Sequence, residues 1–220
     1  MKLFPLLFLN EAQVFASQAY QQGYALVETN FESKITLVFI NKNQMKDASG
    51  NLKQSGDGIV QGYISFIPPE EGDIAEVRSS SALEGWGPLL YQAAMKRIAP
   101  NWLASDTNLS IDANKVWNKC YELKNLYNRK YIGNVSSDRY ECCVSVFSSI
   151  PSDEDMETEQ DFLRFLQSQN VSPENTGCFW AYKKKTHEPE IDVLFREGNI
   201  LLKTVGNEQI FEWINSSNLP

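Results

Sequence analysis

Short apolar runs separated by polar turns dominate the first part of the chain, a pattern that predicts β-strands. The predicted strands are residues 1–9, 34–41 (KITLVFIN) and 59–68 (IVQGYISFIP). A helix is expected over 11–22, with Asn10 as its N-cap. The polar stretch 42–58 predicts a loop, so we expect the strands on either side of it to pair as a hairpin.

The central segment predicts a strand, a tight turn and a helix in immediate succession. Residues 74–83 form a strand that ends in small residues, and Gly85-Trp86-Gly87-Pro88 breaks it. Apolar residues at helical spacing then predict a helix over 89–98. A short strand at 102–104 and a second helix over 112–127 follow.

The last part of the chain predicts a mixed set of elements. An acidic segment, 152–155, leads into a helix over 158–169, with Ser152 and Asp153 as caps. The other expected elements are strands at 178–183, 191–195 and 200–205, a helix at 208–214, and a candidate strand at the run CVSVF within 128–150. Together these elements predict an α/β or α+β fold with a mixed sheet.

Charge and length exclude several classes of function. The net charge of −8 argues against direct nucleic-acid binding, which needs a cationic surface. No run of 18 apolar residues exists, so we expect no membrane span, and the opening MKLFPLLFLN is interpreted as a buried strand rather than a signal peptide. His187 is the single histidine, which removes multi-histidine metal sites, and we expect no metal.

The four cysteines show no Cys-x-x-Cys spacing. Adjacent Cys142 and Cys143 make a poor disulfide or metal pair, so we expect free thiols in a reducing compartment. This expectation places the protein in the cytoplasm.

The turn at 85–88 is the part of the sequence that points to chemistry. Gly85 and Gly87 leave backbone N–H groups unshielded, and Pro88 suits the first turn of a helix, where its missing N–H is not needed. The helix that begins there adds its positive dipole end, so the junction predicts a phosphate or pyrophosphate site. The alternative that the two glycines only form a tight turn stays open.

Two well-known phosphate loops fit this turn poorly. A P-loop requires Gly-Lys-Ser/Thr, whereas Pro88 and Leu89 follow Gly87. A dinucleotide-binding fold requires a third glycine at position 90, which is Leu90.

The turn instead resembles that of the GNAT superfamily of N-acetyltransferases, whose pattern is Arg/Gln-x-x-Gly-x-Gly/Ala at a strand-to-helix junction. Gly85 and Gly87 match, while Ala82 stands where the family usually has Arg or Gln. Downstream, Ser110-x-x-Ala113-x-x-Val116-Trp117 is similar to the family's Asn-x-x-Ala-x-x-Leu-Tyr. The combination, with FWAY near residue 180, looks like a divergent set of such proteins encoded by tailed bacteriophages.

The resemblance implies an acyl-CoA-dependent N-acyltransferase fold and activity, with acetyl transfer from acetyl-CoA to an amine by direct attack. It implies an acyl-CoA-binding core over 1–127 and a C-terminal extension, 128–220, that completes the sheet and carries the acidic helical segment. The implied cofactor-binding residues are Ala82, Leu83, Glu84, Gly85, Trp86, Gly87, Pro88 and Leu89.

Catalytic candidates follow from the same resemblance. The family's proton-donating tyrosine falls at Trp117, and indole is not a proton donor at neutral pH. Tyr121 lies one helical turn further on, so we expect Tyr121 as the acid and Glu76 as the base, with Asp106 and Ser110 as other polar candidates.

Two departures from the family pattern, Ala82 and Trp117, support a second hypothesis. A non-catalytic structural or interaction protein on the same fold, such as a virion or host-interaction component, is also compatible with the sequence. The expected partners are acyl-CoA and an unidentified amine acceptor, and a homodimer or virion proteins are alternatives. For a phage protein the location would be the host cytoplasm or the virion.

Overall fold

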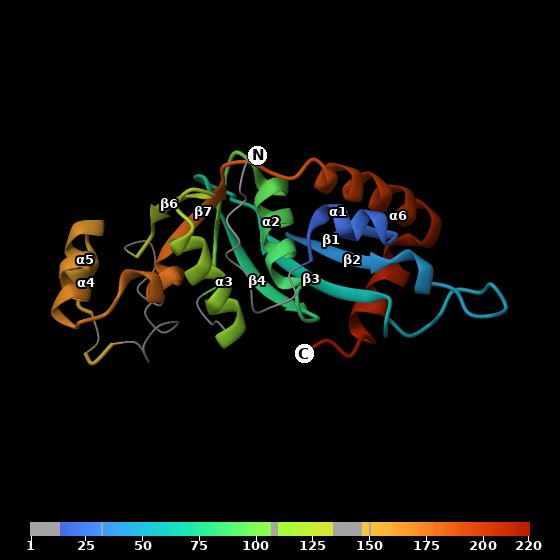
Figure 1. Cartoon of the computed structure of the whole chain (residues 1–220), viewed down its shortest axis with the longest axis horizontal. Helices are drawn as coiled ribbons and strands as arrows, with labels where there is room; N and C mark the ends of the chain where they lie inside the picture. The colour runs from blue at the N-terminus through green and yellow to red at the C-terminus, as the bar shows by residue number, and fades with distance from the viewer. Residues whose placement is uncertain (1–13, 32, 107–109, 134–146, 150) are drawn as a thin grey trace, which may run out of the picture. The chain divides into compact units, whose positions relative to one another are not determined.

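A mixed β-sheet organises the residues that this computed structural model describes, which are 14–31, 33–106, 110–133, 147–149 and 151–220. Its seven strands follow the order β1-β2-β3-β4-β5-β7-β6 (Figure 1). β1 and β2 pair antiparallel, β4 and β5 pair parallel, and β7 runs antiparallel to both of its neighbours. The expected mixed-sheet α/β class is therefore confirmed.

The strands are β1 Tyr24–Phe31, β2 Lys34–Asn41, β3 Val60–Ile67, β4 Ile74–Ala82, β5 Trp102–Ala104, β6 Tyr127–Tyr131 and β7 Trp180–Lys184. The helices are α1 Ala16–Gln21, α2 Gly87–Ile98, α3 Ile111–Glu122, α4 Asp153–Met156, α5 Glu159–Ser168 and α6 Glu190–Asn215. Short 3₁₀ segments lie at η1 Lys42–Gln44 and η3 Pro173–Phe179.

The central elements lie where the sequence predicts them. β2 and β5 match the expected ranges, and β3, β4 and α2 differ from prediction only at their ends. β2 and β3 are neighbours in the sheet, as expected of a hairpin, and the Asn41 N–H donates to the Ile59 carbonyl at 2.8 Å. Ser110 caps α3 by accepting a hydrogen bond from the Ala113 N–H. The caps predicted for the helix over 158–169 are wrong: Ser152 caps the separate short helix α4 by accepting from the Asp155 N–H, and Thr158 caps α5 by accepting from the Asp161 N–H.

The beginning of the described chain differs from prediction in two ways. The first helix starts at Ala16 rather than at residue 11, because the Gln18 side chain accepts a hydrogen bond from the Phe15 N–H and fixes the start there. β1 was not predicted, although its Ala25, Leu26 and Val27 are fully buried. The predicted strand at 1–9 and the Asn10 cap lie outside the described residues.

The end of the chain corrects the prediction most clearly. Strands expected at 191–195 and 200–205 and the helix at 208–214 are one long helix, α6, with a break at Gly206. Ile191, Leu194 and Leu201 recur at helical spacing and are buried, so packing of this face decides the structure over the β-branched composition. α3 ends at Glu122 rather than at 127, because Leu123 leaves the helical conformation with φ −85° and ψ 59°. The CVSVF candidate strand lies mostly outside the described residues.

The chain divides into two compact units built from interleaved segments. Unit 1 contains 1–64, 80–93 and 188–220, and unit 2 contains 65–79 and 94–187. In unit 1, α1 and α6 both contact β1, and the core joins β1, β2 and β3 residues to Leu201, Ile210 and Trp213 of α6 (Figure 1). The predicted boundary between residues 127 and 128 stays a prediction.

Unit 2 has an aromatic core. Trp117 stacks on Tyr182 with ring centroids 5.6 Å apart, and Tyr131 and Phe162 stack at 5.4 Å. Trp180 is fully buried and contacts the rings of Tyr121 and Tyr131. These contacts fix α3 and α5 against β6 and β7.

The cysteines differ from expectation at one position. Cys120 is a free thiol, and burial raises its pKa to about 12, so it stays protonated at neutral pH. Cys178 is disulfide-bonded, which makes the expectation of free thiols wrong there. Spacing along the chain could not reveal this bond, because disulfides depend on distance in the fold.

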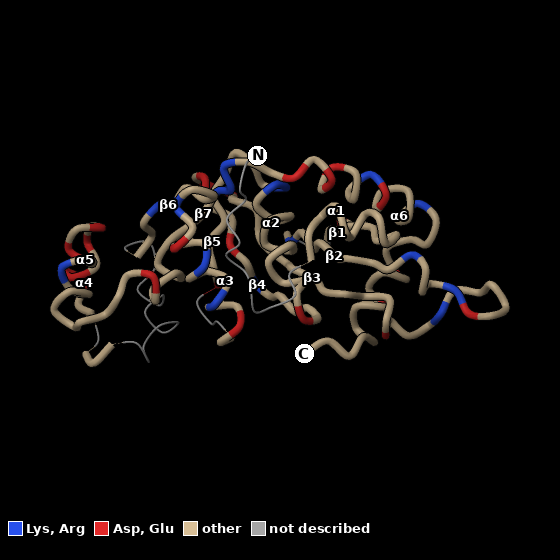
Figure 2. Tube along the Cα trace, in the orientation of Figure 1, with Lys and Arg blue, Asp and Glu red and all other residues tan. Residues whose placement is uncertain are grey.

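None of the described helices is long and apolar enough to cross a membrane. Residues of both charge signs occur along α5 and along α6 (Figure 2).

Candidate functional site

The junction between β4 and α2 has the geometry of a strand–turn–helix, and it lies in unit 1. β4 ends at Ala82, Gly85 adopts a φ of +84°, and α2 begins at Gly87. A positive φ is strained for residues with a side chain, so Gly85 allows the sharp turn. A Cβ at Gly87 would meet nothing within 4 Å, so the backbone at the start of α2 is open to approach.

Some of the amides predicted to hold the cofactor are already used inside the protein. The Leu83 N–H donates to the Gln61 carbonyl at 2.8 Å, and the Trp86 N–H donates to the Leu83 carbonyl at 3.1 Å. Pro88 has no N–H. This leaves the N–H groups of Gly87 and Leu89 as the donors in the first turn of α2, where a helix favours an anion.

Trp86 anchors the turn to the core of unit 1. Its side chain is 5 % exposed, and its ring lies 4.6 Å from that of Tyr24 and 5.1 Å from that of Phe39. The Trp86 side chain is therefore not available to a ligand, and its backbone is also engaged, since its N–H donates to the Leu83 carbonyl and its carbonyl accepts the Leu90 N–H. Leu83 and Glu84, in contrast, are both exposed to solvent.

The turn is also held by contacts that could not be predicted from the sequence. Gly62 of β3 lies against Ala82 and Leu90, and a Cβ there would come within 2.7 Å of the Ala82 Cβ. The hydroxyl groups of Ser80 and Tyr91 are hydrogen-bonded at 3.0 Å, which joins β4 to α2. The Val14 N–H donates to the Gly85 carbonyl at 3.1 Å.

Glu76, the predicted base, lies in unit 2 on β4. Its carboxylate is 3.2 Å from the Arg78 guanidinium, which is also 3.8 Å from the Asp106 carboxylate. The three side chains are partly exposed, so this network contributes little stability. It brings together Glu76 and Asp106, two of the polar candidates from the sequence, through an arginine that sequence reasoning missed.

The network lies where β4 and β5 stop pairing. The parallel register joins Ile74, Ala75 and Glu76 to Trp102, Leu103 and Ala104, where β5 ends. β4 continues beyond Glu76.

Tyr121, the predicted acid, is also in unit 2 and is 5 % exposed on α3. Its ring lies 5.1 Å from that of Trp180, and the Arg129 guanidinium lies 4.2 Å from its centroid. Burial raises the pKa of Tyr121, and the Arg129 charge opposes that rise, so the phenol carries its proton at neutral pH. Arg129 was not singled out from the sequence, because it lies on a different element from Tyr121.

Trp117 occupies the position at which the resembling family has its tyrosine. It is fully buried and stacks on Tyr182. Gly177 packs directly on the backbone of Trp117, and its N–H donates to the Asn118 side chain at 2.8 Å. Trp117 is therefore a core residue of unit 2.

Residues 82–89 lie together in unit 1, whereas Glu76 and Tyr121 lie in unit 2 and contact different partners. Among the described residues no cluster of histidine, cysteine or carboxylate side chains could hold a metal ion.

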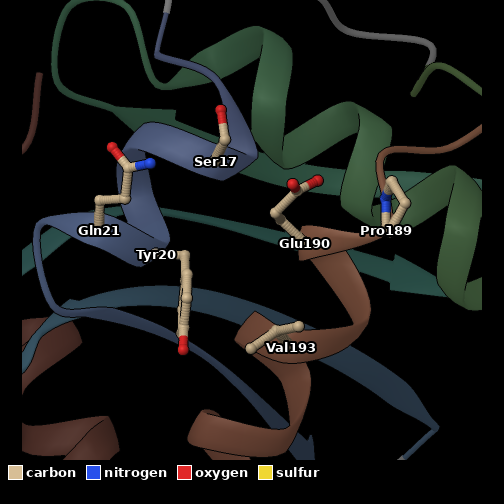
Figure 3. Close-up of a pocket in the computed structure, with 6 residues that line it drawn as sticks. All are labelled: Ser17, Tyr20, Gln21, Pro189, Glu190 and Val193. Atoms are coloured by element: carbon tan, nitrogen blue, oxygen red, sulfur yellow. The ribbon is translucent and has the colours of Figure 1, made fainter.

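A pocket of about 360 Å³ lies elsewhere in unit 1, between α1 and the first turn of α6 (Figure 3). It is lined by Ser17, Tyr20, Gln21, Pro189, Glu190 and Val193. No local sequence pattern could predict this pocket, because its two sides are separated by almost the whole chain.

The chain was compared with known protein families, curated proteins and solved structures. No protein-family model, no curated protein and no solved structure matches the chain.

Proposed function

We propose that this protein binds acetyl-CoA at the β4–α2 turn and transfers the acetyl group to an amine. The observation that carries the proposal is the turn itself: Gly85 has a positive φ, and α2 opens at Gly87 with unobstructed backbone. Helix N-termini of this kind bind phosphate groups through their free N–H donors and dipole. The pyrophosphate of the cofactor is the proposed ligand of the Gly87 and Leu89 amides.

The short pairing between β4 and β5 supports a place for the pantetheine arm. In the resembling superfamily this arm lies where two strands separate. Here β5 pairs with β4 only as far as Glu76, and β4 continues with Val77, Arg78 and Ser79 in the same unit. The main-chain groups of this stretch are the proposed partners of the arm.

In the proposed chemistry Glu76 takes a proton from the acceptor ammonium. The amine nitrogen attacks the thioester carbonyl carbon, and the C–S bond breaks. The departing thiolate takes the Tyr121 proton, and the remaining extra proton on the amide nitrogen passes to the Tyr121 phenolate, so that a neutral amide, free CoA thiol and the phenol result. The raised pKa of Tyr121 keeps the phenol protonated until that step. Arg78 lies between Glu76 and Asp106 and holds the Glu76 carboxylate in place.

Calorimetric titration with acetyl-CoA tests the binding step. We expect micromolar binding by the protein and no binding by Gly87→Glu, whose new carboxylate repels the pyrophosphate and whose Cβ fits without a clash. Asn199→Glu is the matched control, since it adds the same charge to the exposed face of α6 in the same unit and leaves the turn intact. Equal binding by all three proteins would show that acetyl-CoA does not bind at the turn.

Release of free CoA thiol in the presence of a panel of amines tests the transfer step. We expect Tyr121→Phe and Glu76→Gln each to lower kcat by about 100-fold, the usual contribution of a positioned acid or base. The KM for acetyl-CoA should change little, because neither side chain binds the pyrophosphate. Tyr63→Phe, at a tyrosine outside both sites, should leave kcat unchanged.

A second candidate function is a non-catalytic structural or interaction protein on the same fold, and two observations favour it. The Leu83 and Trp86 amides are engaged within the protein, and Trp117 packs in the core where the family has a proton donor. Absence of acetyl-CoA binding at millimolar ligand would support this candidate. For both functions we propose a bacteriophage origin, on the resemblance alone, and a location in the cytoplasm of the host or in the virion.

A further inference from the structure

The pocket between α1 and α6 combines an apolar side with a polar side. The Tyr20 ring and the Val193 side chain lie at one end, while the Glu190 carboxylate and the Ser17 hydroxyl lie at the other (Figure 3). Tyr20 is 46 % exposed, so its ring face is accessible from solvent. A ligand that fits must therefore have an apolar stem and a polar head.

The charge of the pocket indicates the charge of the ligand's polar group. In the described part of the chain Glu190 forms neither an ion pair nor a side-chain hydrogen bond. Nearby Glu188 is engaged, because its carboxylate accepts the Ala16 N–H at 3.1 Å. A carboxylate at the rim repels anionic ligands and attracts a cation with N–H donors.

We propose that this pocket binds a primary alkylammonium group. The ammonium lies against the Glu190 carboxylate and the Ser17 hydroxyl, and the aliphatic stem lies along the Tyr20 ring and Val193. The same chemistry occurs in a peptide lysine side chain and in a free diamine. This site goes beyond the proposed acyl transfer, because it requires neither acetyl-CoA nor the β4–α2 turn.

Calorimetry without acyl-CoA tests the proposal with two probes, Nα-acetyl-lysine-methylamide for a peptide lysine and 1,5-diaminopentane for a free diamine. We expect at least one of them to bind, and 1-pentanol, which has a similar stem without the charge, not to bind. Glu190→Gln should weaken binding about tenfold or more, since a hydrogen bond to a charged partner is lost. Tyr20→Ala should weaken it about threefold.

Glu208→Gln is the matched control, because Glu208 is an exposed carboxylate on the same helix, far from the pocket along the chain. It should bind the probes like the unmodified protein. Circular dichroism of each variant confirms that the helices persist.

Three results would overturn the proposal. The first is no binding of either amine at millimolar concentration, and the second is equal binding of 1-pentanol. The third is an equal loss of affinity in Glu190→Gln and Glu208→Gln, which would reduce the effect to general attraction by an acidic protein. Failure here is distinct from failure of acyl transfer, because Gly87→Glu tests the turn and leaves all residues of the pocket unchanged.

Discussion

Gly62 shows how one residue on β3 supports the turn from a distance. Adding a Cβ there would place it 2.7 Å from the Ala82 Cβ and 2.9 Å from Leu90 Cδ1, so the end of β4 and the start of α2 would have to shift. We expect Gly62→Ala to lower the free energy of unfolding by about 1–3 kcal/mol, the usual cost of overpacking. Urea denaturation measures this change.

Gly87→Ala provides the comparison, because the Cβ at that position has open space. Its unfolding midpoint should stay close to that of the unmodified protein. A similar midpoint for Gly62→Ala would mean that β3, β4 and α2 do not pack as closely as the structure indicates.

Arg129 and Tyr121 give a prediction that depends on pH. Burial raises the folded-state pKa of Tyr121 above the unfolded value of about 10. The stability that the protonated phenol contributes is therefore fully present below about pH 10 and is lost as the pH rises through the folded-state pKa. The Arg129 guanidinium favours the phenolate and limits this rise.

Arg129→Met should consequently move the ionisation of Tyr121 to still higher pH. Absorbance at 295 nm follows the phenolate, and subtracting the titration of the matching Tyr121→Phe protein isolates this one tyrosine from half-buried Tyr131 and buried Tyr182. Arg129→Lys keeps a positive charge, so the pKa of Tyr121 in that variant should lie between its pKa in the unmodified protein and its pKa in Arg129→Met. A downward shift in Arg129→Met would show that the guanidinium does not act on Tyr121.

The catalytic residues predicted from the sequence are those whose position a local sequence pattern can indicate. Glu76 stands on a strand and Tyr121 on a helical face, and both lie on the expected elements. Arg78 and Arg129 were missed because their importance comes from side-chain contacts, and Arg129 reaches Tyr121 across two elements. Spacing predicts which face a residue occupies, but not which charge lies opposite it.

At the scale of elements, α6 shows where composition misleads. The runs IDVLF and ILLKTV are rich in residues that favour strands, and this composition predicts strands at both. The observed helix follows the other signal in the same residues, the helical spacing of Ile191, Leu194 and Leu201, which are buried in unit 1. Tertiary packing selected the helix. β2 and β5 had no such conflict between composition and spacing, and they were predicted correctly.

Trp213 is one of the side chains that hold the end of α6, and its contribution can be tested. Trp213 is fully buried, and its Nε1–H donates to the Lys53 carbonyl at 2.7 Å, which ties the helix to the loop after β2. Trp213→Phe leaves that carbonyl without its donor and removes part of the core volume. We expect a loss of about 2 kcal/mol in the free energy of unfolding.

Thermal or urea unfolding of Trp213→Phe checks this value, with Thr204→Ala as the control. Thr204 is exposed on the same helix and bonds only to the Ile200 carbonyl one turn earlier, so its loss should change stability by less than about 0.5 kcal/mol. Equal effects of the two substitutions would contradict an anchoring role for Trp213.

At the scale of the whole molecule, the chain passes between its two units several times. Unit 1 takes segments from the start, the middle and the end of the sequence, and unit 2 takes the two segments between them. A linear reading of the sequence suggested a core over 1–127 followed by an extension, because motifs end near residue 121 and local patterns carry no information on long-range contacts. The turn at 82–89 and the pocket at α1 and α6 belong to the same unit despite their distance along the sequence.

This organisation predicts that a chain ending at Tyr127 does not fold cooperatively. Unit 1 would lose Leu201, Ile210 and Trp213 from its core, and unit 2 would lose Trp180 together with β7. Because burial of such side chains contributes about 1.5–3 kcal/mol each, the remainder cannot retain a net stability of 5–15 kcal/mol. Removing only residues 218–220 should be tolerated far better, since it costs the exposed hydrogen bonds between Asn218 and Asp57, the bond from the Ser81 hydroxyl to the Pro220 carbonyl, and the packing of one partly buried residue, Leu219. Urea unfolding followed by circular dichroism compares the two truncations with the full chain. A cooperative transition in the 1–127 chain would instead establish the sequence-based core as an independent folding unit, with residues 128–220 as a true extension.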